Sequence, residues 1–241
     1  MSTPRRAITV TITVINRRAA GRTEMEAKVL RADDKSLEIE LRGFPLSMAN
    51  ALRRHLINEV PTMAVEEVMV IENTSSVYNE VLAHRISLIP FRTDLDHFVL
   101  PEECDCGNRL GCERCVVRFS LRARAVSEVV TVYSREMVRE TGTEVVEPVS
   151  GDFPIVKLAP GQTIELELYV RLGTGKKHAK WIPGIATLYD GPDGSRILYF
   201  ESFGFLPPAR AVLEAAKKFE KRTGELEKVL LEAIGDVGKE A

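Results

Sequence analysis

GFPLSMANALRRHLINEVP, residues 43–61, predicts a short helix with a defined start and stop. The Ser47 hydroxyl can cap the first turn and Pro61 cannot continue a helix, so about 13 residues lie between the two signals. The apolar face consists of residues at helical spacing, Ala49, Leu52, Leu56 and Val60. A basic cluster, Arg53, Arg54 and His55, occupies another face. Taken alone, this pattern fits a surface helix that docks on its own sheet and leaves two arginines in water.

Length and composition limit the class of protein. The chain has 241 residues, 44% of them hydrophobic, so it can bury one large core or two smaller ones. Lys and Arg number 33 against 35 acidic residues, which disfavours free DNA or RNA as the main partner. No apolar run approaches the ~20 residues of a membrane span. Thr alternates with Ile and Val over residues 8–14, which indicates a strand rather than a signal peptide. We therefore expect a cytoplasmic protein without membrane contact.

Strand patterns dominate the rest of the chain before Pro207. Residues 27–30 and 37–41 flank a polar turn at 33–35, so we expect a hairpin with one wet face. Further strands are expected at residues 64–72, 163–171 and 196–201. The centre is rich in Val and punctuated by Gly and Pro, which indicates a mostly β region.

A heptad pattern follows Pro207 and Pro208. Apolar or small residues recur alternately four and three positions apart, at Val212, Ala216, Phe219, Thr223, Leu226, Leu230, Ala233 and Val237. A helix of ~27 residues spans about 40 Å, more than a small sheet can cover. Because the sequence offers no second long helix, we expect another subunit to pack on this one. Packing on the chain's own sheet is the alternative.

All four cysteines lie in CDCGNRLGCERC, residues 104–115. A turn at Gly107 and Asn108 can fold the two pairs together, and four thiolates on one short loop suit a structural zinc ion. The predicted ligands are Cys104, Cys106, Cys112 and Cys115, with Arg109 and Arg114 placed to offset thiolate charge. Disulfides or free thiols, and an iron–sulfur cluster, are the alternatives.

Enzyme motifs are missing from the sequence. Gly173, Gly175, Lys176 and Lys177 hint at a phosphate loop, but Val170 stands where the Walker pattern needs Gly. The nucleophile-elbow, zinc-protease and dinucleotide motifs are also missing, and the four histidines are scattered. We therefore expect no catalytic residue in this chain.

Three segments resemble the alpha-type assembly subunits of DNA-directed RNA polymerase, a family that includes the archaeal D subunit, the third-largest subunit of eukaryotic RNA polymerase II and bacterial alpha. They are ANALRRHLINEVPTMAVEEV at 49–68, NEVLAHRISLIPF at 79–91 and GKKHAKW at 175–181. The resemblance implies an α+β fold with a dimerisation domain, residues 1–60 and 162–241, that has an antiparallel sheet and two helices. It also implies a mostly β insert domain, residues 61–161, that contains the Cys loop.

Partners are implied by the same resemblance. The small alpha-like L subunit would contact Leu52, Leu56, Val212, Ala216, Phe219, Leu226 and Leu230. The second-largest polymerase chain, the B subunit, would contact Arg53, Arg54, Lys176, Lys177, His178, Lys180 and Trp181. Two small zinc-binding chains, the N and P subunits, would join this platform, while nucleotidyl transfer belongs to other chains of the complex. The runner-up interpretation is a free-standing zinc-containing adaptor that binds nucleic acid through the basic helix.

Two departures from the family pattern affect the cofactors. The gap between Cys106 and Cys112 is longer than is usual in the family's zinc loop, which leaves the metal open. Some archaeal members carry a ferredoxin-like iron–sulfur insertion, but the corresponding residues 184–194 are few and hold no cysteine. We therefore expect no iron–sulfur cluster. Residues 1 to about 20 resemble an extension beyond the usual start.

Overall fold

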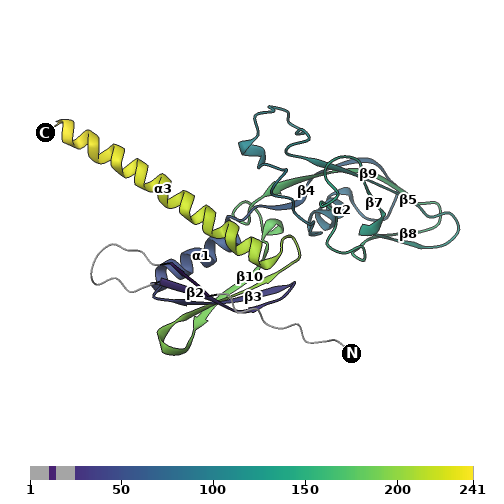
Figure 1. The fold of residues 1–241 in the computed structure, drawn as a ribbon. Coiled ribbons are helices and arrows are strands. Elements are labelled where there is room, and N and C mark those ends of the chain that lie inside the picture. Colours follow the sequence, from purple (N-terminus) through teal and green to yellow (C-terminus); the bar gives the residue numbers. More distant parts are fainter. Residues whose placement is uncertain (1–10, 15–24, 241) are drawn as a thin grey trace. The chain divides into compact units, whose positions relative to one another are not determined.

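The computed structural model describes residues 11–14 and 25–240 of the chain (Figure 1). The strands are β1 Thr11–Val14, β2 Met25–Ala32, β3 Ser36–Arg42, β4 Thr62–Asn73, β5 Val117–Arg124, β6 Val130–Tyr133, β7 Met137–Arg139, β8 Pro154–Leu158, β9 Thr163–Gly173, β10 Gly184–Asp190 and β11 Arg196–Ser202. The helices are α1 Leu46–Asn58, α2 Asn79–Ser87 and α3 Pro208–Glu240. Short 3-10 turns are η1 Pro101–Glu103, η2 Ser134–Glu136, η3 Ala179–Trp181 and η4 Pro192–Gly194. The expected α+β class is confirmed.

Two compact units divide the chain. The terminal unit takes its described residues from both ends, up to Val60, from 184 to 202 and from Pro207 on. The central unit comprises residues 61–183 and 203–206. The expected boundary at residue 161 differs from this division, because β9 is hydrogen-bonded between β4 and β5 and so belongs to the central unit. Apart from β1, the expected N-terminal extension lies outside the described residues.

The terminal unit is built on a five-stranded antiparallel sheet in the order β1-β2-β3-β11-β10. The predicted hairpin is present, since β2 pairs with β3 around the turn at Asp33. The Asp33 carboxylate accepts hydrogen bonds from the backbone amides of Lys35 and Ser36, which lower its pKa to about 2. Both α1 and the start of α3 pack on the sheet and on each other.

Helix α1 has the predicted length but not the predicted cap. It runs over 13 residues and ends before Pro61, as expected. The Ser47 prediction was wrong, because Pro45 takes the N-cap position and Ser47 lies within the first turn. The Pro45 carbonyl accepts hydrogen bonds from the amides of Met48 and Ala49, which leaves no cap role for the Ser47 hydroxyl.

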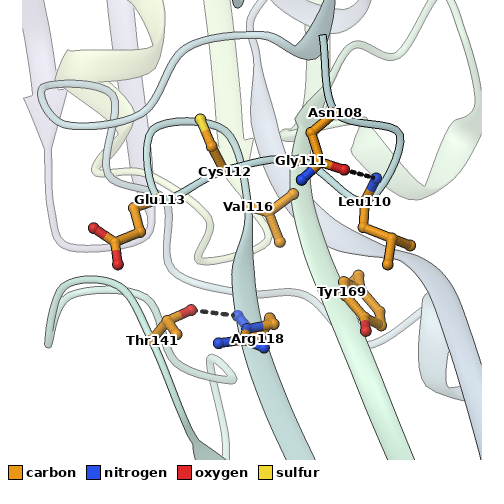
Figure 2. A pocket seen from close by; sticks show the side chains of 9 residues that line it. All are labelled: Asn108, Leu110, Gly111, Cys112, Glu113, Val116, Arg118, Thr141 and Tyr169. Atoms are coloured by element: carbon orange, nitrogen blue, oxygen red, sulfur yellow. Dashed lines mark hydrogen bonds between the residues drawn. The ribbon is translucent and has the colours of Figure 1, made fainter. Parts of the chain in front are cut away.

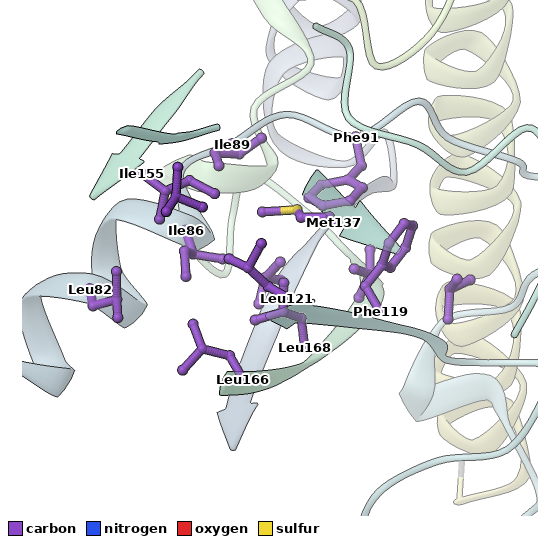
Figure 3. Close-up of a cluster of buried hydrophobic side chains, with 14 of the residues drawn as sticks. Leu82, Ile86, Ile89, Phe91, Phe119, Leu121, Met137, Ile155, Leu166 and Leu168 are labelled. Carbon is purple, nitrogen blue, oxygen red and sulfur yellow. The ribbon is translucent and has the colours of Figure 1, made fainter. Parts of the chain in front are cut away.

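The central unit has a four-stranded antiparallel sheet, β4-β9-β5-β7, and a two-stranded sheet, β6-β8. This confirms the expectation of a mostly β centre, with helix α2 as an addition that the strand patterns did not predict. Leu82 and Ile86 of α2 are fully buried against the sheet, where they join a core that includes Phe91 and Phe119 (Figure 3). The rings of Phe91 and Phe119 meet edge to face with centroids 5.3 Å apart. This core closes the unit on itself.

Among the described residues, none of the helices combines the length and apolar composition required to cross a bilayer.

Candidate functional site

The four cysteines lie on a loop of the central unit between η1 and β5. Two glycines give the loop its shape. Gly107 has a φ of +60° and Gly111 a φ of +86°, a region that favours glycine. A Cβ on Gly111 would also come within 2.3 Å of the side chain of Val116, the residue before β5, so the loop can approach Val116 this closely only with glycine there.

The sulfur atoms form a cluster with the dimensions of a tetrahedral metal site. The Sγ atoms of Cys104 and Cys112 are 3.7 Å apart, those of Cys112 and Cys115 3.8 Å, and those of Cys106 and Cys115 3.9 Å. Four thiolates at the usual Zn–S distance of about 2.3 Å are separated by about 3.8 Å along each tetrahedron edge. All four ligand atoms lie within 4.8 Å of one another, and all four thiols are free. The predicted cysteines are therefore brought together in an arrangement that could bind a metal such as zinc.

The pKa values of two of the thiols are shifted in opposite directions by their surroundings. The backbone N–H of Arg114 lowers the pKa of Cys112 to about 7, whereas burial raises the pKa of Cys115 to about 12. A coordinated cation would deprotonate both, since metal-bound thiols ionise outright. The Arg114 guanidinium lies near Cys104 and Cys112 and also pairs with Asp105, which partly fits its predicted role in charge compensation. The other predicted cation, Arg109, offers its carbonyl to the Arg171 guanidinium at 2.8 Å.

Beside the cysteine loop lies a pocket of about 290 Å³ that the sequence did not suggest (Figure 2). Its lining combines loop residues with side chains from the outer face of the sheet: Asn108, Leu110, Gly111, Cys112, Glu113, Val116, Arg118, Thr141 and Tyr169. The alternating burial of residues 117–124 is readable in the sequence as a half-exposed strand. Only the fold places the loop over that strand.

A second feature is an apolar groove between α1 and α3 in the terminal unit. Its volume is about 410 Å³, and its lining is almost wholly apolar: Phe44, Met48, Leu52, Ala216, Phe219, Glu220 and Thr223. One wall is set by the Phe219 ring, which packs against the His55 ring with centroids 5.0 Å apart. The Arg222 guanidinium reaches Glu59 at 3.5 Å and links the two helices beyond the groove.

Helix α3 extends well past this groove without cover. Ala211, Val212 and Ala215 are buried, but none of the described side chains after Ala215 is. The described side chains end at Ile234 within this helix. Large apolar residues on this stretch are all at least half exposed: Leu226, Val229, Leu230, Leu231 and Ile234. The heptad position Val237 lies beyond the described side chains. An exposed apolar stripe along a helix is typical of an interaction surface.

The residues expected to contact a small alpha-like subunit fall into two groups. Leu52, Ala216, Phe219, Leu226 and Leu230 line the groove or stand exposed on α3. Leu56 and Val212 are buried inside the terminal unit, so they support the surface from beneath.

The residues expected to contact the second-largest polymerase chain belong to different units. Arg54 is exposed on α1, while Arg53 is half-buried and its Nε donates to Asn50 at 3.0 Å. Arg53 also lines an open hollow of about 670 Å³ against β10. The basic cluster of the helix thus presents Arg54 most freely, because His55 is engaged with Phe219.

In the central unit, some of the expected contact residues are exposed and others are buried. Lys176, Lys177 and His178 are exposed. Trp181 is only 2% exposed and its carbonyl accepts a hydrogen bond from Thr62 at 2.8 Å. Lys180 lies 4.3 Å from the centroid of the Trp181 ring and its ammonium pairs with Glu66. Trp181 is therefore an interior residue beneath the exposed basic residues, and its side chain is not available as an anchor on the surface.

Comparisons with known proteins identify similar chains. A family model described as the RNA polymerase Rpb3/RpoA insert domain matches residues 68–183. The chain is 44% identical over 165 residues to DNA-directed RNA polymerase subunit Rpo3 of Pyrobaculum neutrophilum, a match that covers 68% of this chain and 62% of the relative.

Rpo3 from two further archaea gives similar matches. The identity is 38% over 159 residues to the subunit of Methanosphaera stadtmanae, with 65% of this chain and 57% of the relative covered. It is 39% over 160 residues to that of Pyrococcus horikoshii, with 66% and 57% covered. The chain thus spans about three fifths of the length of the curated relatives it matches.

Proposed function

Because the chain belongs to the Rpb3/RpoA family of RNA polymerase subunits, we propose that it is a non-catalytic assembly subunit of DNA-directed RNA polymerase. In this role it would act in the cytoplasm, and other chains of the complex would carry out nucleotidyl transfer in transcription. The terminal unit would serve as the dimerisation domain and the central unit as the insert domain.

The observation that carries this proposal is the uncovered apolar surface of the terminal unit. The α1–α3 groove and the exposed stretch of α3 form one candidate surface, which we name the helix-pair surface and define by Leu52, Ala216, Phe219, Leu226 and Leu230. Helices whose apolar faces find no cover in their own unit gain stability by pairing with another chain. The partner would be a small alpha-like chain, the archaeal L subunit, with an apolar face that matches this surface. The two chains would form a one-to-one heterodimer.

Charged surfaces support further partners. Arg54 on α1 and the exposed Lys176 and Lys177 near η3 offer cations for the second-largest polymerase chain, the B subunit, and the exposed His178 lies beside these lysines. Arginine is enriched at the anchor positions of interfaces, and partly exposed cations add mainly specificity and rate. The small zinc-binding N and P subunits would join the same platform.

The cysteine loop would hold zinc as a structural ion. Bound there, zinc supplies a tetrahedral cross-link among Cys104, Cys106, Cys112 and Cys115. The chain's own residues supply the rest. Gly107 and Gly111 allow the loop to fold, and Arg114 holds positive charge beside the thiolates.

The test is coexpression with a small alpha-like subunit, followed by size-exclusion chromatography with light scattering. The wild-type chain should form a one-to-one heterodimer that Phe219→Asp plus Leu226→Asp abolishes. Because Phe219 also packs on His55, Leu226→Asp plus Leu230→Asp tests the exposed stretch alone. Lys228→Asp, about 200° around the helix from Leu226, is the matched control and should leave the dimer intact. A wild-type monomer that ignores every candidate and binds DNA in a salt-dependent way would instead favour the adaptor.

A further inference from the structure

The outer face of the four-stranded sheet carries many charged side chains, and several of them have a bonded partner. Arg122 bonds Glu165 at 2.9 Å on the neighbouring strand, and Arg171 reaches Glu67 at 3.2 Å. Glu167 accepts a hydrogen bond from the Tyr169 hydroxyl at 3.2 Å, and Glu140 accepts one from Ser120. Two of these contacts are ion pairs, whereas Glu167 and Glu140 bond hydroxyl groups and keep their charge.

Arg118, like Arg124 on the same face of β5, has no ion pair with another described residue. It lies opposite Tyr169 in the β5–β9 register, two residues before Ser120. Its backbone amide donates to Thr141 Oγ1 at 3.0 Å, but its guanidinium has no carboxylate partner. This free cation stands in the pocket beside the cysteine loop, where Figure 2 shows loop residues on one side and Arg118, Thr141 and Tyr169 on the other.

The pocket has walls suited to an apolar side chain. Leu110 and Val116 contribute aliphatic surface, and Tyr169 packs with Val116 and Cys115. The hollow surface also continues past Arg118 along β5, into an adjoining pocket of about 250 Å³ lined by Ile71, Ser120 and Arg122 among others. Residues 118, 120 and 122 point to the same face at the two-residue repeat of a strand, so an extended chain can lie along them.

We propose that this groove binds an extended peptide segment of another protein, with an Asp or Glu carboxylate at Arg118 and a neighbouring apolar side chain against Leu110, Val116 and Tyr169. A carboxylate fits better than a phosphate because Arg118 is the only cation in the lining of the first pocket, and Glu113 stands at the same rim. Glu113 can instead accept a hydrogen bond from the peptide backbone. This proposal goes beyond the role in assembly and does not depend on it.

The cysteine loop also forms one wall of this groove. Cys112 and Gly111 form part of the pocket wall, and the loop is tied to the sheet where the Arg171 guanidinium donates to the Arg109 carbonyl. The fold of the loop therefore sets the shape of one side of the binding groove.

The test is a titration of peptides into the full zinc-loaded chain. Binding is monitored through the backbone amide chemical shifts of residues 108–118, 141 and 169 in nuclear magnetic resonance spectra. The probe is the N-acetylated, C-amidated peptide Ala-Leu-Glu-Val-Ala, and the matched probe has Gln in place of Glu. We expect saturable shifts with the Glu peptide and roughly two- to fivefold weaker binding of the Gln peptide, in line with one partly exposed ion pair.

Two variants locate the site. Arg118→Gln should weaken binding of the Glu peptide roughly two- to fivefold and abolish its preference over the Gln peptide. Arg122→Gln, on the same strand and face but already paired with Glu165, should leave binding unchanged, and zinc content and melting temperature of both variants show whether they fold. Equal binding of both peptides, unaltered binding by Arg118→Gln, or tighter binding of inorganic phosphate at the same amides would overturn the proposal.

Discussion

The central unit and the terminal unit differ in where their apolar side chains lie. The central unit encloses Phe91, Leu121 and Leu166, each fully buried between its sheets and α2. The terminal unit buries the first turns of α3 and then leaves Leu226 and Leu230 at least half exposed. The central unit also exposes apolar residues such as Ile71 and Val126, but those of α3 follow one another along one helix, as on a surface that another chain could cover.

The difference also separates two kinds of functional residue. In the central unit, the candidate metal ligands and the peptide groove depend on how a loop sits on a closed core. In the terminal unit, the candidate interface is the part of the core that the chain does not cover. A substitution should therefore act on stability in one unit and on association in the other.

The largest effect on stability is expected from opening the central core. Phe91→Ala removes a fully buried ring that packs on Phe119, and should lower the free energy of unfolding by about 3–5 kcal/mol. Trp181 is the only tryptophan and is buried in the central unit, so its fluorescence during urea denaturation reports this unit directly. A loss below about 1 kcal/mol would mean that the core is not closed as described.

Removal of the metal should have the next largest effect on stability. If free zinc is about 1,000-fold above its dissociation constant, chelation removes about 4 kcal/mol of stability from the unit that binds it. We expect the Trp181 transition to move to lower urea while the helical circular dichroism signal of α3 changes little. Zinc should restore the transition in the wild type but not in Cys112→Ser, and metal content should fall in that variant. An unchanged transition in a chain that has lost bound metal would contradict the structural role.

A pH dependence should follow from Asp94, which lies in the central unit. Burial alone would raise its pKa, but hydrogen bonds from His97 and Thr143, both at 2.8 Å, outweigh burial and lower it below 3.8. The contribution of Asp94 to stability is therefore fully present above about pH 4 and is lost as the pH falls through the lowered pKa.

Asp94→Asn should cost about 1.5–3 kcal/mol at neutral pH, because it replaces a charged acceptor of several hydrogen bonds. Its stability should also fall less steeply than that of the wild type between pH 4 and 2. Urea denaturation at a series of pH values measures both. Parallel curves for the two proteins would exclude Asp94 as the group responsible.

The smallest effect on the isolated chain is expected in the terminal unit. Leu230→Ser changes a side chain that is 50% exposed, so the free energy of unfolding should stay within about 0.5 kcal/mol. The same variant should weaken the heterodimer with an alpha-like partner, as measured by light scattering at decreasing concentration. Destabilisation of the isolated chain by more than about 1 kcal/mol would mean that α3 is already covered.

Local patterns in the sequence predicted much of the fold. Alternation and the polar turn at Asp33 predicted the β2–β3 hairpin, Pro61 predicted the end of α1, and the clustered cysteines predicted their own assembly. Each of these features depends on neighbours within a few positions in the chain. The Ser47 cap failed because Pro45 already filled the cap position, two residues earlier than expected.

Features that depend on distant partners were not predictable in this way. β9 alternates like a strand of either unit, and only its pairing with β4 and β5 assigns it to the central one. Trp181 has the residue type of an interface anchor, but Gly173 lets its ring pack inward, since a Cβ there would lie 2.3 Å from that ring. Arg118 resembles any charged residue on a half-exposed strand in the sequence, and only the fold places it in the pocket beside the cysteine loop.

Hydrogen–deuterium exchange on the chain alone and with a small alpha-like subunit tests most directly whether the terminal unit is completed by a partner. The backbone amides of residues 221–234 should exchange rapidly in the isolated chain and at least about tenfold more slowly in the complex. Those of β5 and β9 should be equally protected in both. Strong protection of residues 221–234 in the isolated chain, or no gain on mixing, would contradict the account.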